Sequence, residues 1–242
     1  MIVLKHNKNT NKWFSGKVLR VIKDFNLIED NEIIAVGLSG GVDSITLLLI
    51  LEYIRRFSHI NFKIIAVHVQ VYDKHDTKIL EDYCKDLDVE FMNIYVDDHN
   101  LPVPDKGICY TCSKLRKGAL VEHLKARNIN KVAFGHHADD LLETLLMNMD
   151  YHKLLDTLMP FTFLDRTGFY ILRPMLCLSK KEIIKIHKYF ELPLADFNCK
   201  YEEKNRREVF RDLVNDIDEK LPDFSNRAAE SVLNFLKKAN KS

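Results

Sequence analysis

The feature that constrains the fold most is residues 33–51, where a turn of small residues joins an apolar strand to an apolar helix. This stretch reads I-I-A-V-G-L-S-G-G-V-D-S-I-T-L-L-L-I-L. Residues 33–36 have the length and composition of a buried strand, and the helical pattern that follows predicts an N-cap at Asp43 or Ser44. Backbone N–H groups at a helix N-terminus, together with the positive end of the helix dipole, attract phosphate. The sequence therefore predicts an anion-binding loop over residues 39–44.

The spacing of this loop disfavours two common nucleotide motifs. It is not G-x-x-x-x-G-K-[ST], because no lysine follows the glycines, and it is not G-x-G-x-x-G. The string S-G-G-V-D-S instead resembles the S-G-G-x-D-S loop of the N-type ATP pyrophosphatases, which cleave ATP between the α and β phosphates and transfer AMP to an oxygen. The resemblance implies ATP contacts from Ser39, Gly40, Gly41, Asp43 and Ser44. A glycine-rich turn without a ligand is the alternative interpretation.

Composition limits the class of protein. The chain has 242 residues, 46% of them apolar and none in a run near the ~20 residues of a membrane span, so we expect no membrane association. The apolar segment at the N-terminus is too short for a signal peptide, which favours a cytoplasmic location. The net charge of +1 does not indicate a nucleic-acid-binding protein. Two local basic groups could still bind phosphates, or could be solvated helix faces: Lys114, Arg116, Lys117, Lys125 and Arg127, and Lys200, Lys204, Arg206, Arg207 and Arg211.

Strands and helices alternate along the chain, which predicts an α/β fold with a doubly wound parallel sheet and helices on both faces. The predicted strands are residues 33–36, 62–69, 90–96 and 131–134, with a possible edge strand at 169–172. The predicted helices are 11–28, 43–57, 76–88, 112–127, 139–152, 179–190, 203–217 and 226–239. For the helix at 179–190, Ser179 and Glu182 form a predicted capping box. We expect an N-terminal helical segment (1–30), an α/β domain (31–175) and a C-terminal helical extension (176–242).

In such sheets the ligand binds beyond the carboxyl ends of the strands. That rule places the glycine loop on the same rim as His68 and Gln70, the loop at 97–112, and the Gly135-His136-His137 segment. Three separate sequence features are therefore expected to converge in space.

Two of the five cysteines form a C-x-x-C pair, Cys109 and Cys112. The pair alone could be half of a zinc site, half of an iron–sulfur site, a redox dithiol or two ordinary thiols. Cys199, in a polar stretch far downstream, is the best candidate for a third thiolate. Three cysteines around a [4Fe–4S] cluster would leave one iron open to bind sulfur. Cys84 and Cys177 lie in apolar patterns typical of packed thiols.

The segment G-H-H-A-D-D-L-L-E-T at 135–144 follows a predicted strand and opens a helix. Asp139 and Asp140 share a helical face with Glu143 and could hold Mg²⁺ against a pyrophosphate. His136 or His137 could serve as a hydrogen-bond donor or an acid. The alternative is helix capping, with acidic residues in the first turn stabilised by the helix dipole.

Taken together, S-G-G-V-D-S, C-Y-T-C-S-K-L-R-K-G-A-L, G-H-H-A-D-D-L-L-E-T-L-L-M-N and L-R-P resemble the tRNA 2-thiocytidine synthetase group, over residues 15–215. In that group a cluster held by three cysteines works with ATP and Mg²⁺ to replace the C2 oxygen of a tRNA cytidine with sulfur. The resemblance implies the adenine nucleotide alpha hydrolase-like (PP-loop) fold. Cys109 and Cys112 match the paired cluster ligands, and Cys199 lies near the third. The segment around Cys199 departs from the group's P-C-x-x-C, and Val42 stands where a lysine is commoner.

The resemblance also implies roles for individual residues. ATP adenylates the C2 oxygen, and the loop N–H groups with a Mg²⁺ ion held by Asp43, Asp139 or Asp140 stabilise the pyrophosphate. Sulfur then displaces AMP. The expected site residues comprise a catalytic set (Asp43, Asp139, Asp140, Lys117), a nucleotide-binding set (Ser39, Gly40, Gly41, Asp43, Ser44, His68, Gly135, His136) and a cluster-binding set (Cys109, Cys112, Cys199). Lys114 and Arg116, with Lys117, would bind tRNA phosphates.

The expected partners are a tRNA and a sulfur donor, either a cysteine desulfurase or sulfide, with a possible homodimer. Three other functions remain open. The enzyme could form 2-thiouridine, or it could carry out lysidine-type chemistry, in which an amine attacks the adenylated carbonyl and no C-x-x-C pair is needed. The chain could also be a zinc-stabilised RNA-binding protein that retains an ATP site.

Overall fold

The strand predicted at residues 33–36 lies inside a mainly parallel sheet. The computed structural model describes residues 11–71, 74–96, 108–195, 197 and 207–239. In this part of the chain the sheet has six strands in the order β3-β2-β1-β4-β6-β5. The parallel strands are β1 (Ile33–Gly37), β2 (Lys63–Val71), β3 (Glu90–Val96), β4 (Lys131–Ala133) and β6 (Phe169–Leu172), and β5 (Phe161–Leu164) runs antiparallel to β6. The predicted α/β class and parallel sheet are confirmed.

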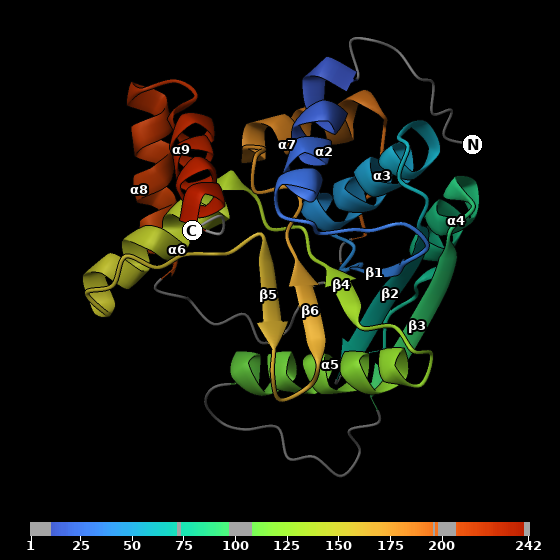
Figure 1. The fold of residues 1–242 in the computed structure, drawn as a ribbon. Helices are drawn as coiled ribbons and strands as arrows, with labels where there is room; N and C mark the ends of the chain where they lie inside the picture. The colour runs from blue at the N-terminus through green and yellow to red at the C-terminus, as the bar shows by residue number, and fades with distance from the viewer. Residues whose placement is uncertain (1–10, 72–73, 97–107, 196, 198–206, 240–242) are drawn as a thin grey trace.

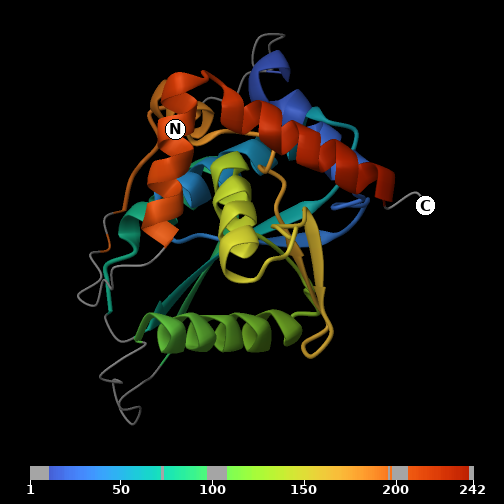
Figure 2. The same cartoon turned by 90° about the vertical axis from the view of Figure 1, so that its left-hand side faces the viewer.

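Helices cover both faces of this sheet, as predicted (Figure 1). Of the described helices, only α5 (Ile108–Lys125) lies across one face, where it packs on β2 and β3. The opposite face is covered by α2 (Gly16–Asp24), which the short segment η1 (Asn11–Ser15) precedes, and by α3 (Val42–Phe57), α4 (Lys78–Leu87) and α7 (Lys180–Tyr189). Figure 2 shows α5 below the sheet and the other helices above it. Helices α8 (Arg207–Lys220) and α9 (Phe224–Ala239) both pack on α6 (Ala138–Tyr151).

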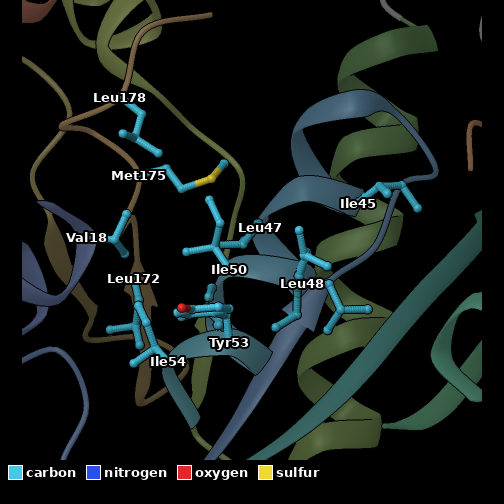
Figure 3. Close-up of a cluster of buried hydrophobic side chains, with 14 of the residues drawn as sticks. Val18, Ile45, Leu47, Leu48, Ile50, Tyr53, Ile54, Leu172, Met175 and Leu178 are labelled. Atoms are coloured by element: carbon cyan, nitrogen blue, oxygen red, sulfur yellow. The ribbon is translucent and has the colours of Figure 1, made fainter. Parts of the chain in front are cut away.

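Helix α3 is buried nearly all round, because the sheet lies on one side of it and α7 on the other. Figure 3 shows Leu47, Ile50 and Tyr53 of this helix near Val18 of α2 and Leu172 of β6. A helix apolar on every face is typical of a core position. This packing fixes the N-terminus of α3, and therefore the glycine loop that precedes it.

Shortening a core side chain of α3 should destabilise the protein strongly. Leu48 is 0% exposed, and we expect Leu48→Ala to lower the free energy of unfolding by about 2–5 kcal/mol, through lost burial and the cavity that remains. Leu155 is 86% exposed, so Leu155→Ala serves as a control with the same chemical change and an expected effect within about 0.5 kcal/mol. Denaturant titration of both variants measures the difference. Equal effects would contradict the burial of α3.

The start of α3, the start of α5 and the position of β6 in the sheet differ from the prediction. Gly41, rather than Asp43 or Ser44, is the N-cap of α3; the Ser44 hydroxyl is used inside the loop instead. Helix α5 begins at Ile108 rather than at Cys112, so Cys109 also lies within the helix rather than before it. The strand at 169–172 is not an edge strand, because the hairpin partner β5 lies outside it. The capping box of Ser179 and Glu182 is confirmed. Among the described helices none is both long and apolar enough to cross a bilayer.

Candidate functional site

The glycine loop is held in shape by its own hydroxyl groups. The backbone N–H of Ser39 donates to Ser44 Oγ over 3.1 Å, the Ser39 hydroxyl donates to the same oxygen over 3.0 Å, and the Ser44 hydroxyl donates to the Gly41 carbonyl over 3.1 Å. Gly40 has φ +91°, a conformation that L-residues with side chains rarely adopt. The loop therefore delivers the first N–H groups of α3, which have no intrahelical partners, to one place. Such a place binds phosphate.

The segment after β4 packs directly against this loop. A Cβ atom on Gly135 would lie 2.9 Å from the backbone carbon of Asp43 and 3.1 Å from the backbone nitrogen of Ser44. Only glycine allows the two backbones to approach so closely. The close approach brings the acidic start of α6 beside the N-terminus of α3, as the rule for strand ends predicts.

A cavity of about 890 Å³ opens at the carboxyl ends of β1, β2 and β4, a size typical of nucleotide and drug-sized ligands. Most of the predicted site residues line it: Ser39, Gly41, Asp43, Ser44, His68, Cys112, Lys117, Gly135, His136 and Asp140. Gly40 and Asp139 are buried beside the cavity without lining it in the described part. For Cys109 only the helical backbone is described, and Cys199 lies outside the described residues.

Three carboxylates surround the imidazole of His137. Its Nδ1 lies 3.3 Å from Asp139, and its Nε2 lies 3.4 Å from Asp140 and 3.9 Å from Asp43. Burial alone would lower the pKa of His137, but the neighbouring carboxylates outweigh burial and raise it. Burial would also raise the pKa of Asp139, yet His137 lowers it below its usual value. The surroundings therefore favour protonation of His137 and disfavour protonation of His136.

Two cations, Lys180 and Arg207, contact the acidic residues of the site, although the sequence alone did not assign them to it. The ammonium Nζ of Lys180 lies 2.6 Å and 2.7 Å from the two oxygens of Asp43. Arg207 lines the cavity, 3.3 Å from Asp140 and 2.9 Å from Glu143. Arg207 belongs to one of the basic groups noted in the sequence. For Lys180 the available signal is a cation in the first turn of a helix, where the dipole disfavours it.

The acidic residues fit a Mg²⁺ ion that arrives with a nucleotide. Within the described part of the chain, no three His, Cys, Asp or Glu side chains are grouped to hold a metal ion by themselves. Magnesium in nucleotide sites needs only one or two carboxylates, with substrate phosphates and water as the other ligands. Asp43 and Asp140 both line the cavity and both lie near His137 Nε2. They could hold the ion, whereas Asp139 accepts the backbone N–H of Lys180 over 2.7 Å.

Two neutral histidines line the cavity. His68 Nδ1 lies 2.7 Å from the Leu38 carbonyl, which can only accept, so Nδ1 carries the proton and Nε2 is left as an acceptor. Burial, and then the charges of Arg116 and His75, lower the pKa of His68 despite that hydrogen bond. Burial lowers the pKa of His136 to about 4. The His68 Nε2 and His136 Nδ1 atoms are buried and have no hydrogen-bond partner in the described part, so each could receive a polar group of a ligand.

The lowered pKa of His136 predicts acid sensitivity. Its pKa falls from 6.5 to about 4 on folding, so the unfolded chain binds the additional proton first as the pH falls below 6.5. Folding stability should therefore drop between pH 6.5 and 4, by on the order of 3 kcal/mol for this group. His136→Gln should remove that part of the drop in denaturant titrations. The exposed His59 provides the control substitution, His59→Gln. An unchanged pH profile in His136→Gln would contradict the lowered pKa.

Cys112 is half-buried and lines the same cavity as Ser39, followed along α5 by Arg116 and Lys117. Cys109 precedes it by three residues in the same helix. Thiolates are the protein ligands of iron–sulfur clusters, so this helix end fits part of the predicted ligand set. The described residues thus place one candidate cluster ligand and the phosphate loop on the walls of one cavity.

A phosphate-binding loop after a central parallel strand, with an acidic helix N-terminus packed beside it, defines a nucleotide-binding α/β protein. The chain matches the PP-loop domain family over residues 11–217 and belongs to that family.

Curated relatives and a solved structure agree with this assignment. A tRNA-cytidine(32) 2-sulfurtransferase from Psychrobacter sp. (strain PRwf-1) is 32% identical over 221 residues, which cover 89% of this chain and 60% of that protein. One from Tolumonas auensis is 31% identical, with 90% of this chain and 74% of that protein covered. The chain thus spans between three fifths and three quarters of these relatives. The U34-tRNA thiolase NcsA from Methanococcus maripaludis, solved with its [4Fe-4S] cluster, has a TM-score of 0.71 at 19% identity, with 96% and 84% of the two chains covered. That likeness confirms the fold.

Proposed function

We propose that this protein is an ATP-dependent tRNA thiolase that replaces the C2 oxygen of a cytidine with sulfur. The observation that carries the proposal is the shared cavity, in which Cys112 and the loop at 39–44 both form the wall. Activation and sulfur delivery must occur at the same carbon, so the two groups have to face one space. The names of the curated relatives support the reaction and the cytidine substrate.

The first step is the adenylation of the base. The C2 oxygen attacks the α-phosphorus of ATP, and pyrophosphate leaves. The loop N–H groups and the α3 dipole stabilise the charge on the phosphates, and Asp43 and Asp140 would hold Mg²⁺ against them. The exposed Lys117 and Arg116, at the cavity wall, bind phosphates of the nucleotide or the tRNA. Asp139 has a positioning role, because it fixes His137 and the N-terminus of α7.

In the second step sulfide-level sulfur bonds to C2 while the bond from C2 to the AMP oxygen breaks and AMP leaves. Cys112, with Cys109 and Cys199, would hold a [4Fe–4S] cluster, which would bind the donor's sulfur at an iron without a cysteine ligand. His68 presents an acceptor nitrogen, and His136 a ring nitrogen without a partner in the described part; both orient the base or the ribose of a ligand in the cavity. The half-buried side chains of Phe134 and Phe197 also line the cavity and provide apolar surface for stacking with a base.

The proposal extends to the partners. The proposed sulfur donor is sulfide or a cysteine desulfurase, the proposed site of action is the cytoplasm, and a homodimer is one candidate for the oligomeric state. The exposed basic side chains Lys114, Arg116 and Lys117 at the start of α5 lie where tRNA phosphates would approach the cavity. Sedimentation of the purified protein measures the oligomeric state directly.

The test is reconstitution. The protein, purified without oxygen and supplied with iron and sulfide, is incubated with ATP, Mg²⁺, a sulfide source and unmodified tRNA. Mass spectrometry of the digested nucleosides should detect 2-thiocytidine, with AMP and pyrophosphate formed in equal amounts. Formation of 2-thiouridine or of a lysine adduct would replace the cytidine assignment. If the purified protein contains zinc and forms no AMP, the proposed enzymatic activity is wrong.

A further inference from the structure

Lys180 links α7 to both sides of the nucleotide site. It is the first residue of α7, directly after the cap Ser179. Its backbone N–H donates to Asp139 over 2.7 Å, and its ammonium donates to both oxygens of Asp43 over 2.6 Å and 2.7 Å. Both side chains of the ion pair remain partly accessible, at 39% for Lys180 and 35% for Asp43. Asp43 lines the cavity, and Lys180 lies directly beside it without lining the cavity in the described part of the chain.

This position is electrostatically unfavourable for a lysine in the absence of a partner. The first turn of a helix carries a partial positive charge, which disfavours a cation. The phosphate loop itself has no basic residue between Gly37 and Ser44. Lys180 thus provides a cation beside a loop that has none, although its own helix opposes it.

The ammonium also occupies the place where a divalent ion would bind. A Mg²⁺ ion that accompanies a nucleotide coordinates a carboxylate oxygen that faces the phosphates, and Asp43 is such a carboxylate on the cavity wall. Both of its oxygens already accept hydrogen bonds from Lys180. Each oxygen keeps a further lone pair, but a metal ion bound there would lie beside the ammonium, and repulsion between the two cations favours displacement of Lys180.

We infer that Lys180 and the divalent ion compete for Asp43, and that Lys180 moves to the nucleotide phosphates when the metal–nucleotide complex binds. A lysine ammonium is a compact point charge on a flexible stem and binds phosphate in that form. The exchange leaves Asp43 neutralised at every stage, first by Lys180 and then by the metal ion. Lys180 is therefore a positioning residue for Asp43 and a phosphate ligand in the bound state. The inference rests on the proposed ATP site.

Equilibrium binding separates this exchange from a simple structural tie. The probes are Mn²⁺ alone, followed by electron paramagnetic resonance, and α,β-methylene-ATP in EDTA, followed by calorimetry. For Lys180→Met we expect Mn²⁺ to bind up to about fivefold more tightly, the range of one partly exposed ion pair, and the metal-free nucleotide to bind at least fivefold more weakly. A structural tie would weaken both ligands together.

Three further variants serve as controls. Lys181→Met changes the next, exposed residue of α7 and should leave both affinities unchanged. Lys180→Arg keeps the cation and should restore most of the nucleotide affinity. Lys180→Gln keeps a polar group of similar length and should behave like Lys180→Met, with unfolding midpoints confirming that each variant is folded.

The two possible failures are distinguishable. The exchange is wrong, while the ATP site stands, if Lys180→Met and Lys180→Gln have the same affinities for both ligands as Lys181→Met. It is also wrong if these two variants bind both Mn²⁺ and the metal-free nucleotide more weakly. If the unaltered protein binds neither nucleotide nor metal–nucleotide, the proposed function is wrong and the inference with it.

Discussion

Replacing Cys112 with alanine is expected to abolish tRNA thiolation while nucleotide binding persists. Cys112 lines the cavity that the phosphate loop also lines, and the proposed cluster depends on its thiolate. Loss of a metal ligand removes affinity for the group, so the visible absorbance of the reconstituted protein should fall and the rate of thiolation should drop at least about hundredfold. Binding of α,β-methylene-ATP should change by less than about twofold, because the loop at 39–44 is untouched.

The matched control is Cys84→Ala. Cys84 is 0% exposed, and burial raises the pKa of its thiol to about 12, so it is an inert packed thiol. This variant should lose only stability and should keep its absorbance and thiolation. Full thiolation by Cys112→Ala would refute the cysteine-dependent scheme. Loss of nucleotide binding in the same variant would indicate instead that Cys112 supports the phosphate site.

Much of the fold could be predicted because its strands are apolar and its helices periodic. The strands predicted at 33–36 and 90–96 are found at those positions. The edge strand β5 was missed because it has only four residues, Phe161–Leu164, and derives its strand character from pairing with β6. Tertiary pairing, rather than local pattern, decides such short strands.

The part of the site that lies next to the carboxyl ends of the strands could be predicted from the sequence. Ligands bind beyond the carboxyl ends of parallel strands, and this rule predicted that His68, His136 and the glycine loop lie at the same edge of the sheet. Lys180 was not predictable, because its contact with Asp43 joins residues separated by 137 positions. Likewise, the sequence left His136 and His137 equivalent. Only their surroundings, three carboxylates around His137 and burial of His136, shift their pKa values in opposite directions.

These placements change how the acidic cluster is understood. The carboxylates were expected as metal ligands, yet in the described structure each of them contacts a basic side chain: Asp43 contacts Lys180, Asp139 contacts His137, and Asp140 contacts Arg207. Lys180 and Arg207 come from the predicted C-terminal extension. The extension therefore contributes charge to the nucleotide site, and truncating the chain near residue 175 would leave two carboxylates at the cavity without their partners.

The second large effect is expected from Gly135→Ala. The added Cβ would lie 2.9 Å from the Asp43 carbon, 3.0 Å from the Asp43 oxygen and 3.1 Å from the Ser44 nitrogen. All three are backbone atoms, which cannot rotate away, so the start of α3 must shift. A displacement of the phosphate-binding N–H groups by even part of an ångström is costly. We expect the affinity for α,β-methylene-ATP to fall about ten- to hundredfold, measured by calorimetry.

The matched control is Gly118→Ala, where the same methyl group meets no atom within 4 Å. Gly118 lies within α5, so alanine there should raise the stability by up to about 1 kcal/mol through its higher helix propensity and should leave nucleotide affinity unchanged. The two variants thus separate close backbone approach from the loss of a glycine as such. If Gly135→Ala binds nucleotide as tightly as Gly118→Ala does, the loop tolerates displacement, and the phosphate site cannot depend on the contact between the segment after β4 and the N-terminus of α3.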